Sequence, residues 1–344
     1  MIDPSGTAPE VSLVVVNFNG AACLGRCLDS LRAGEDPRTE VIVVDNASSD
    51  DSPAMLAAYV DAHPQIGLVR SAINRGYAGA VNFVLPRCRG RYIGVLNMDV
   101  VAEPGWLAPL VAFLDAHADV GAVNPLLTLL DGETVNAIGQ DLHVTGLGFN
   151  RGLGQPRSQV GLQPLVTDGL QGAAFVIRRD LLERIGGMDE SGFLYHEDVH
   201  LSWMLRLLGY RIACLPIAVV RHDYFLSMHA VKLYLLERNR WSLLLTALHW
   251  PTLLALAPLL LTTELMVWGY SLLRGRRFLH AKARSYAYLW QQRTAHRAQR
   301  DRVRAIRMVG DLKLLRELRL RYAWGQFGKL ARERGPPRRP LVGA

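Results

Sequence analysis

Short apolar runs alternate with polar turns through the first third of the chain. Each run is long enough for a buried strand and too short for a helix. The four runs are VSLVVV (11–16), EVIVV (40–44), IGLV (66–69) and YIGVL (92–96). We expect helices between them, near residues 21–31, 52–62 and 74–85. Strands that alternate with helices pair in parallel, so the pattern predicts an α/β fold with flanking helices around a mostly parallel central sheet.

Polar residues follow each of these runs, at the edge where parallel strands end. The pairs are Asn17 and Asn19, Asp45 and Asn46, Asn74 and Arg75, and Asn97 and Asp99. Asn and Asp also cap helices and form turns, and that alternative explains any single pair. Ligands of open α/β sheets bind at this edge, so four pairs together favour a ligand site. The first turn lacks the glycine spacing of a dinucleotide-binding loop, which disfavours an NAD site.

The alternation of apolar runs and polar turns is weak over residues 121–169 and clear again after them. We expect a strand at 172–177, a helix at 179–185 and a closing strand at 210–215. Glu197 and Asp198 stand before an apolar helix. Acids are favoured at any helix start by the helix dipole, so a structural role is the alternative to a catalytic one.

The charge of the chain is divided unevenly. Residues 270–344 carry 20 Lys and Arg against 4 Asp and Glu, whereas residues 1–269 carry 19 against 27. An acidic body with a basic tail predicts that the tail meets an anionic partner. The four cysteines form no CxxC pair, which favours buried, reduced thiols. The first ten residues have neither a basic nor an apolar segment, so we expect no export signal.

A long apolar run follows residue 240. From Trp241 to Leu273 the only formal charge is Glu264, and the run is long enough to span a bilayer. A buried helix pair is the alternative. Pro251 and Pro258 interrupt the run. A single span would place the basic tail outside the cytoplasm, whereas basic loops are usually cytoplasmic. We therefore predict re-entrant or interfacial membrane-associated helices over residues 236–275.

The region 276–344 is predicted to be a basic amphipathic helical tail. Its apolar positions recur near helical spacing: Val303, Ile306, Val309, Leu312, Leu315, Leu318, Tyr322 and Phe327. Such a helix suits an anionic membrane surface. No aromatic and basic platform of an RNA-binding module accompanies it, so we expect no nucleic-acid partner.

Seven segments resemble the family-2 glycosyltransferases with a GT-A fold, in particular bacterial rhamnosyltransferase-like members. They are VVVNFNG (14–20), VIVVDNASSD (41–50), NRGYAGAVN (74–82), LNMD (96–99), GAAFVIRRDLLERIGGMDE (172–190), HEDVHLSW (196–203) and ERNRWSLL (237–244). The resemblance implies a GT-A catalytic domain over residues 1–235. It also implies an inverting transfer of sugar from a nucleotide-diphosphate donor, with dTDP-rhamnose as the analogy. The acceptor would be a lipid-linked or cell-surface polysaccharide, as in cell-wall biogenesis.

The resemblance assigns a divalent metal, Mg²⁺ or Mn²⁺, to Asp99. A departing diphosphate needs a cation to neutralise its developing charge. His222 resembles a second metal ligand of some members, although a lone histidine is usually solvated or packed. Asn97 stands where many members have a further carboxylate, so the site would rest on one direct carboxylate.

The remaining roles follow from the same resemblance. Asp45 would read the donor base and ribose. Asp198 would be the catalytic base, with Glu197 orienting the acceptor. The other residues predicted to bind substrate are Asn17, Asn19, Asp50, Arg75, Gly76, Gly172, Ala173 and Trp203. We expect the enzyme at the cytoplasmic face of the membrane, where nucleotide sugars are found. A second copy of the chain, in a homodimer, is a further candidate partner.

Two differences from the family pattern leave other functions possible. His200 and Met204 replace the Asp and Arg that members commonly have beside the acceptor. The alternative function is therefore a catalytically silent member that acts as a membrane scaffold or a sugar-binding subunit. A nucleotidyltransferase is a third hypothesis, but it would normally carry a glycine-rich basic first loop.

Overall fold

The computed structural model describes residues 8–33 and 38–332, and the chain forms two compact units. Unit 1 contains residues 1–140, 150–193 and 210–224, and unit 2 contains residues 141–149, 194–209 and 225–344. The units exchange segments along the chain, whereas the sequence suggests one boundary near residue 235. That boundary stays a prediction.

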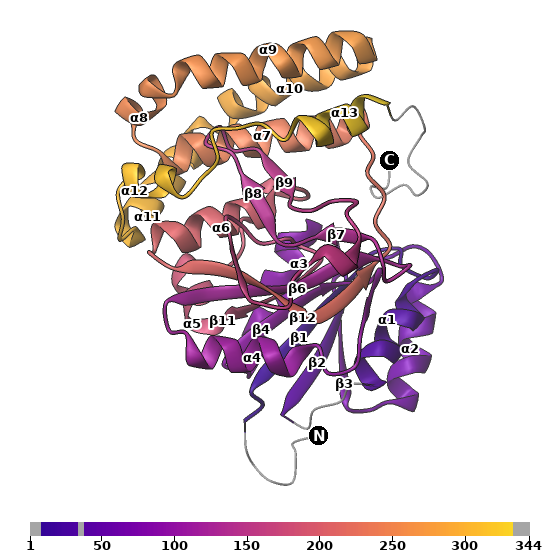
Figure 1. Cartoon of the computed structure of the whole chain (residues 1–344). Helices are drawn as coiled ribbons and strands as arrows, with labels where there is room; N and C mark the ends of the chain where they lie inside the picture. The colour runs from indigo at the N-terminus through magenta and orange to yellow at the C-terminus, as the bar shows by residue number, and fades with distance from the viewer. Residues whose placement is uncertain (1–7, 34–37, 333–344) are drawn as a thin grey trace. The chain divides into compact units, whose positions relative to one another are not determined.

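Unit 1 is built on a mixed sheet (Figure 1). The strand order is β10-β12-β6-β11-β4-β1-β2-β3, with β5 beside β12 and β7 beside β6. The strands are β1 Val11–Asn17, β2 Thr39–Asp45, β3 Ile66–Arg70, β4 Tyr92–Asn97, β5 Val100–Ala102, β6 Val120–Leu129, β7 Val135–Ala137, β10 Leu165–Thr167, β11 Ala174–Arg178 and β12 Arg211–His222.

The predicted parallel sheet is confirmed for its first four strands. β1 pairs in parallel with β2 and β4, and β2 pairs in parallel with β3. Every residue of β1 is buried, as expected for an uninterrupted β-branched run covered on both faces. β11 runs antiparallel to both β4 and β6, which makes the sheet mixed.

Helices and short helical turns connect the strands of unit 1. They are α1 Leu24–Ala33, α2 Ser52–Ala62, α3 Gly76–Val84, η1 Leu85–Arg87, α4 Leu107–Ala116, η2 Arg157–Gln159, α5 Arg179–Ile185 and η3 Glu190–Gly192. The first three match the predicted helices closely. All four cysteines are buried and free, as predicted.

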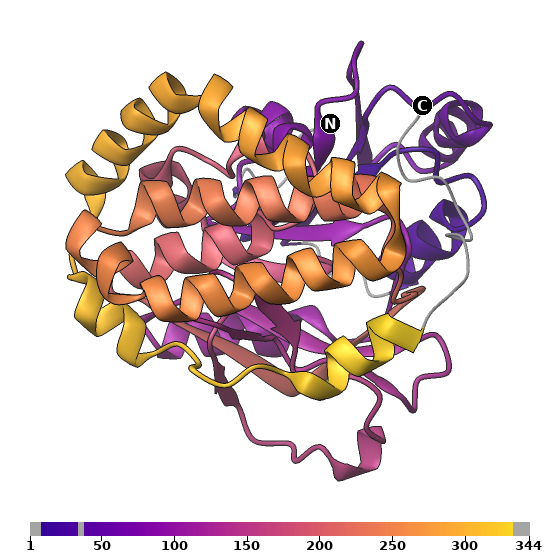
Figure 2. The same cartoon turned by 90° about the horizontal axis from the view of Figure 1, so that it is seen from above.

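Unit 2 is largely helical. Its helices are α6 Glu197–Leu207, α7 Ala230–Ala247, α8 Trp250–Ala255, α9 Ala257–Arg274, α10 Arg276–Gln291, α11 Arg293–Ile306, α12 Asp311–Arg316 and α13 Trp324–Arg332. A two-stranded sheet of β8 (Gln140–Leu142) and β9 (Gly148–Asn150) lies largely within unit 2. α10 packs against both α7 and α9, and these three helices lie side by side in Figure 2.

The apolar run after residue 240 is divided among α7, α8 and α9. Among the described helices, none combines the length and the apolar character that a membrane span requires.

The prediction of one amphipathic helix through residues 303–327 is wrong. The segment is broken at Arg307–Gly310 and again after Arg316. Asp311 fixes the first break, because it accepts hydrogen bonds from the His249 amide and the Thr252 hydroxyl and pairs with Arg307. Two of the expected lipid-facing residues, Val303 and Leu318, are buried within unit 2, whereas Leu312 is exposed.

Candidate active site

Asn17 organises the carboxyl edge of β1 and β2. Its side chain is fully buried, and its Nδ2 lies 3.0 Å from Asp45 Oδ1, 3.1 Å from Ser48 Oγ and 3.0 Å from Ser52 Oγ. β1 and β2 are in register to their last residues, where Asn17 pairs with Asp45. The register therefore places Asp45 at the sheet edge, and the Asn17 amide fixes the orientation of its carboxylate.

The loops beside this pair are held by Asn19 and Asp50. Asn19 adopts a left-handed conformation at φ 52°, and its Oδ1 accepts from the Ser49 amide at 2.8 Å. Asp50 accepts from the Ala21 amide at 2.9 Å and from the Ser52 amide at 3.0 Å. Burial raises the pKa of Asp50, but these hydrogen bonds and that of the Ser52 hydroxyl outweigh it and lower the pKa below its ordinary value. Asp50 thus shapes the loops around Asp45.

Asn46 joins β2 to the loop that opens α3. Its Nδ2 donates to Asn74 Oδ1 at 3.0 Å and to the Gly76 carbonyl at 3.1 Å, while its Oδ1 accepts from the Arg75 amide at 2.9 Å. Gly76 has φ +70°, and a Cβ there would lie 2.0 Å from the Phe193 carbonyl oxygen. Only glycine fits this position.

The Arg75 guanidinium is held on two sides. Its Nε donates to Ser71 Oγ at 3.0 Å, and it lies over the Phe83 ring, 4.4 Å from the ring centre. These contacts restrict a long side chain at the sheet edge, where the resemblance places an anionic ligand group.

Asp99 and His222 come together because β5 pairs with β12. In that antiparallel pairing His222 is opposite Val100, the residue after Asp99, and the Asp223 amide donates to the Asp99 carbonyl at 3.0 Å. His222 Nε2 then lies 3.5 Å from Asp99 Oδ1. Sequence reasoning named both residues, and the structure brings them together.

Asn136 determines which His222 nitrogen carries the proton. Its Oδ1 lies 2.9 Å from His222 Nδ1, and an amide oxygen can only accept. This contact favours the tautomer with its proton on Nδ1, which leaves Nε2, beside Asp99, able to bind a cation. Asn136 was not among the predicted site residues, whereas Asn46 was predicted at the sheet edge without a role of its own.

A divalent cation fits between these two atoms. An imidazole nitrogen and a carboxylate oxygen are both metal ligands. No cluster of three or more His, Cys, Asp and Glu suited to a metal occurs among residues 8–33 and 38–332. Such a site therefore resembles those in which one or two protein ligands are completed by substrate phosphates.

The predicted residues on β4 and before β11 are also at this edge. The backbone N–H of Asn97 donates to the Ala173 carbonyl at 3.0 Å, and Tyr77 Oη donates to the Gly172 carbonyl at 2.8 Å. The antiparallel pairing of β11 with β4 produces this neighbourhood. Gly172 and Ala173 therefore present a backbone segment beside Asn97.

In unit 2, Glu197 and Asp198 open α6 after a strained segment. Tyr195 and His196 have φ of 63° and 75°, which non-glycine residues rarely adopt. Asn239 of α7 donates to the carbonyls of Leu194 at 3.2 Å and Tyr195 at 2.8 Å. His196 Nε2 lies 2.7 Å from the Gly146 carbonyl. These bonds hold the segment in a conformation that it would not adopt alone.

The two acids differ in their surroundings. Burial and then the negative charge of Asp198 raise the pKa of Glu197 to about 8. This shift favours the protonated form of Glu197. Asp198 Oδ1 accepts from the Val199 amide at 2.8 Å, which orients the carboxylate. Burial lowers the pKa of His196 to about 4, so that ring is neutral.

Trp203 lies elsewhere on α6. Its side chain is fully buried, and its indole nitrogen has no hydrogen-bond partner among residues 8–33 and 38–332. Such burial is typical of a core residue and does not support the predicted contact with substrate.

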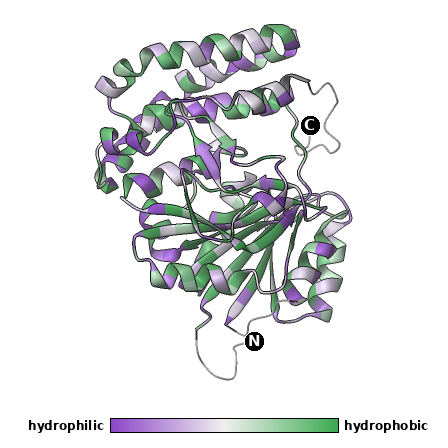
Figure 3. Cartoon of the chain, viewed as in Figure 1, coloured by the Kyte–Doolittle hydropathy of each residue, from purple (hydrophilic) through white to green (hydrophobic). Residues whose placement is uncertain are grey.

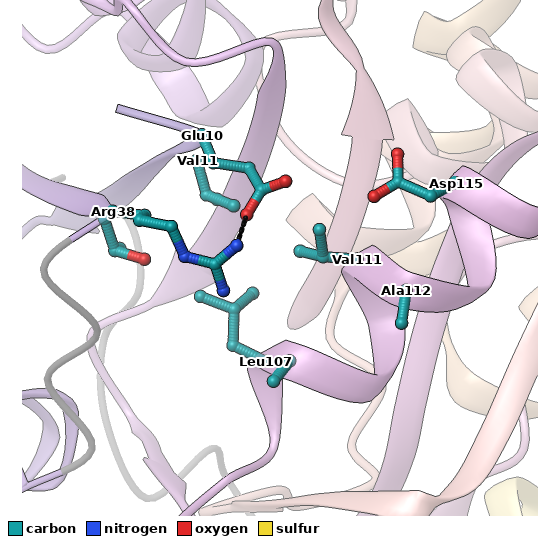
Figure 4. Close-up of a pocket in the computed structure, with 9 residues that line it drawn as sticks. Glu10, Val11, Arg38, Leu107, Val111, Ala112 and Asp115 are labelled. Atoms are coloured by element: carbon teal, nitrogen blue, oxygen red, sulfur yellow. Dashed lines mark ion pairs between the residues drawn. The ribbon is translucent and has the colours of Figure 1, made fainter. Parts of the chain in front are cut away.

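A hollow in unit 1 lies at the opposite edge of the sheet (Figure 4). It is lined by the starts of β1 and β2 and by α4, and the ion pair between Glu10 and Arg38, 2.7 Å long, crosses it. None of the predicted site residues lines it.

Comparison with known proteins matches the family profile "Glycosyl transferase family 2" to residues 12–186. The chain is similar to the pre-mycofactocin glycosyltransferase of Mycobacterium tuberculosis, with 33% identity over 64% of this chain and 44% of the relative. It thus spans less than half the length of that relative.

Two further proteins extend the comparison. An N-acetylglucosaminyl-diphospho-decaprenol L-rhamnosyltransferase of Mycobacterium tuberculosis is 29% identical over 61% of this chain and 75% of the relative. The crystal structure of GalNAc-T7 with UDP, GalNAc and Mn²⁺ matches with a TM-score of 0.58 and 17% identity, over 70% of this chain and 48% of that one. This structural likeness shows that the two chains share the GT-A fold.

Proposed function

The chain belongs to glycosyl transferase family 2, and on this premise we propose that it transfers a sugar, with inversion, from a nucleotide-diphosphate donor to a lipid-linked or cell-surface glycan. The observation that carries the proposal is the Asp99 and His222 pair, with its two acceptor atoms 3.5 Å apart, at the sheet edge that also holds Asp45.

The donor would bind along this edge. Asp45, oriented by Asn17, would accept a hydrogen bond from the nucleobase, and Arg75 would approach the diphosphate. A divalent cation held by Asp99 and His222 would act as a Lewis acid towards the diphosphate oxygens. The Mn²⁺ named in the GalNAc-T7 structure supports a divalent metal, and we propose Mn²⁺ or Mg²⁺.

Asp198 would serve as the general base. The acceptor hydroxyl oxygen bonds to the anomeric carbon, the bond from that carbon to the diphosphate breaks, and the hydroxyl proton passes to Asp198. Glu197, whose pKa is raised by burial and by the neighbouring Asp198, would orient the acceptor. One displacement opposite the leaving group inverts the anomeric centre.

The names of the relatives support a bacterial glycan acceptor. One relative is named as a rhamnosyltransferase acting on a diphospho-decaprenol-linked sugar. We propose a similar lipid-linked acceptor here, with dTDP-rhamnose as the first donor to test.

The test is transfer by an Asp198→Asn variant. We expect product formation to fall by about 10²–10⁴-fold, as for the loss of a general base, while the thermal shift caused by donor and Mn²⁺ is unchanged. Asp301→Asn, at an exposed acid of α11, is the matched control and should keep full activity. Unchanged turnover in Asp198→Asn would refute its role, and no donor hydrolysis or transfer by the wild type would favour the silent scaffold.

A further inference from the structure

One face of α8 and α9 exposes a row of large apolar side chains. The most exposed is Leu273, at 88%, and Leu254 follows at 75%; the row also contains Trp250, Leu261, Leu265 and Leu272. Within α9, residues 261, 265 and 272 are separated by four and seven positions, which places them on one side of a helix. We call these six residues the leucine face.

The leucine face is distinct from the core side of α9. Leu260 and Thr263 are buried on that side. Glu264 is turned inward as well, where it pairs with Lys282 at 2.7 Å and accepts from Trp241 Nε1 at 2.8 Å. α9 is thus anchored in unit 2 by one side and leaves large apolar groups exposed on the other. Figure 3 shows the hydrophobic colours that recur along this helix.

The charge around the leucine face has one sign. Between residues 241 and 300, all of which the structure describes, Glu264 is the only acid, and its charge is neutralised internally. The exposed cations of the segment include Arg276, Arg277 and Arg284 of α10, the helix that packs against α9. An apolar stripe near cations, without an exposed carboxylate in this segment, complements a lipid bilayer, whose interior is apolar and whose headgroups can be anionic.

We propose that the leucine face docks unit 2 onto the surface of an anionic lipid bilayer. The leucines enter the boundary between headgroups and acyl chains, Trp250 lies at the interface, and the arginines of α10 contact the anionic headgroups. The lipid contact is thus assigned to α8 and α9, within the segment 236–275 that the sequence predicts to be membrane-associated. The proposal does not depend on sugar transfer, because it concerns the free protein and the bilayer alone.

The experiment is co-sedimentation with vesicles in the absence of any donor. The full-length chain is mixed with vesicles of phosphatidylcholine and phosphatidylglycerol in equal parts. The double variant Leu261→Glu with Leu265→Glu should lower the partition coefficient by about tenfold or more, because two leucines no longer leave water. Its thermal unfolding should match the wild type, since both residues are exposed. Leu162→Glu, at an equally exposed leucine of unit 1, is the matched control and should bind as the wild type does.

A second pair of measurements separates charge from apolar contact. Arg276→Gln with Arg277→Gln should weaken binding to the mixed vesicles and leave the weaker binding to phosphatidylcholine alone unchanged. A wild type that fails to sediment with the mixed vesicles, or equal losses in the Leu162 and Leu261/Leu265 variants, would overturn the proposal. So would a wild-type dimer in sedimentation velocity that the Leu261/Leu265 variant dissociates while it still binds vesicles, because the face would then join two copies of the chain.

Discussion

The side chain of Asn136 helps to orient His222. Its amide oxygen lies 2.9 Å from Nδ1, which favours a proton there and leaves Nε2 towards Asp99. Loss of such a partner typically lowers metal affinity by about 10–100-fold. We expect Asn136→Ala to have this effect on Mn²⁺ binding, measured by calorimetry with a donor nucleotide present.

A double-variant comparison checks that Asn136 acts through the imidazole ring. His222→Ala should lose at least as much affinity as Asn136→Ala, and the two changes together should lose no more than His222→Ala alone. Additive losses would show that Asn136 contributes by another route.

Single residues also show where sequence reasoning reaches its limit. Asp99 and Asp45 could be predicted because each follows an unmistakable buried strand. Asn136 could not, since it lies in the weakly patterned segment 121–169, and only the pairing of β7 with β6 fixes its position in the sheet. Asn46 was visible beside Asp45, but nothing in the sequence shows that its amide links two loops.

At the scale of elements, α7 holds the segment that leads into α6. The Asn239 amide is bonded to two carbonyls of this segment, and Tyr195 and His196 are strained there. Backbone strain of this kind costs about 1–3 kcal/mol at each residue, so the segment relaxes once its partner is lost. We expect Asn239→Ala to lower kcat by about 10–100-fold through misplacement of Asp198, with little change in the donor KM.

The control is Ser242→Ala on the same helix. The Ser242 hydroxyl is buried, donates to the Arg238 carbonyl at 2.8 Å and lies 3.0 Å from His296 Nε2. Both variants lose buried hydrogen bonds, so a comparable fall of kcat in Ser242→Ala would mean that Asn239 acts only through stability.

Element type was predicted well where one physical signal dominated. Short apolar runs gave β1, β2 and β4 nearly to the residue. The antiparallel direction of β11 was beyond the sequence, because a short buried run fits either direction equally. The prediction of one helix in the tail failed for a different reason. Its apolar residues keep helical spacing across the break before α12, while Asp311 closes that turn with contacts to nearby Arg307 and to the distant His249 and Thr252.

At the scale of the whole chain, the basic surplus of the last third is partly internal to unit 2. Lys282 is fully buried and Arg240 nearly so, and they share the carboxylates of Glu237 and Glu264. The cluster joins α7, α9 and α10 and carries no net charge. The apolar run could therefore hold Glu264 without exposing its charge, while Arg276, Arg277 and Arg284 of α10 are exposed.

This cluster makes the stability of unit 2 sensitive to acid. Burial raises the pKa of Glu237, but Arg240 and Lys282 outweigh it and lower the pKa to about 2. A carboxyl whose pKa is lower in the folded state stabilises the fold above its unfolded pKa, about 4.3, and that contribution is lost as the pH falls towards 2.

Lys282→Met leaves a buried carboxylate uncompensated, which typically costs about 3–5 kcal/mol, and should move the acid-unfolding midpoint to higher pH. Lys282→Met with Glu264→Gln removes one charge of each sign, so it should recover much of the loss. Arg284→Met, at an exposed cation of the same helix, should unfold as the wild type does in denaturant titrations at each pH; an equal loss there would show that the sensitivity comes from surface charge and not from the buried cluster.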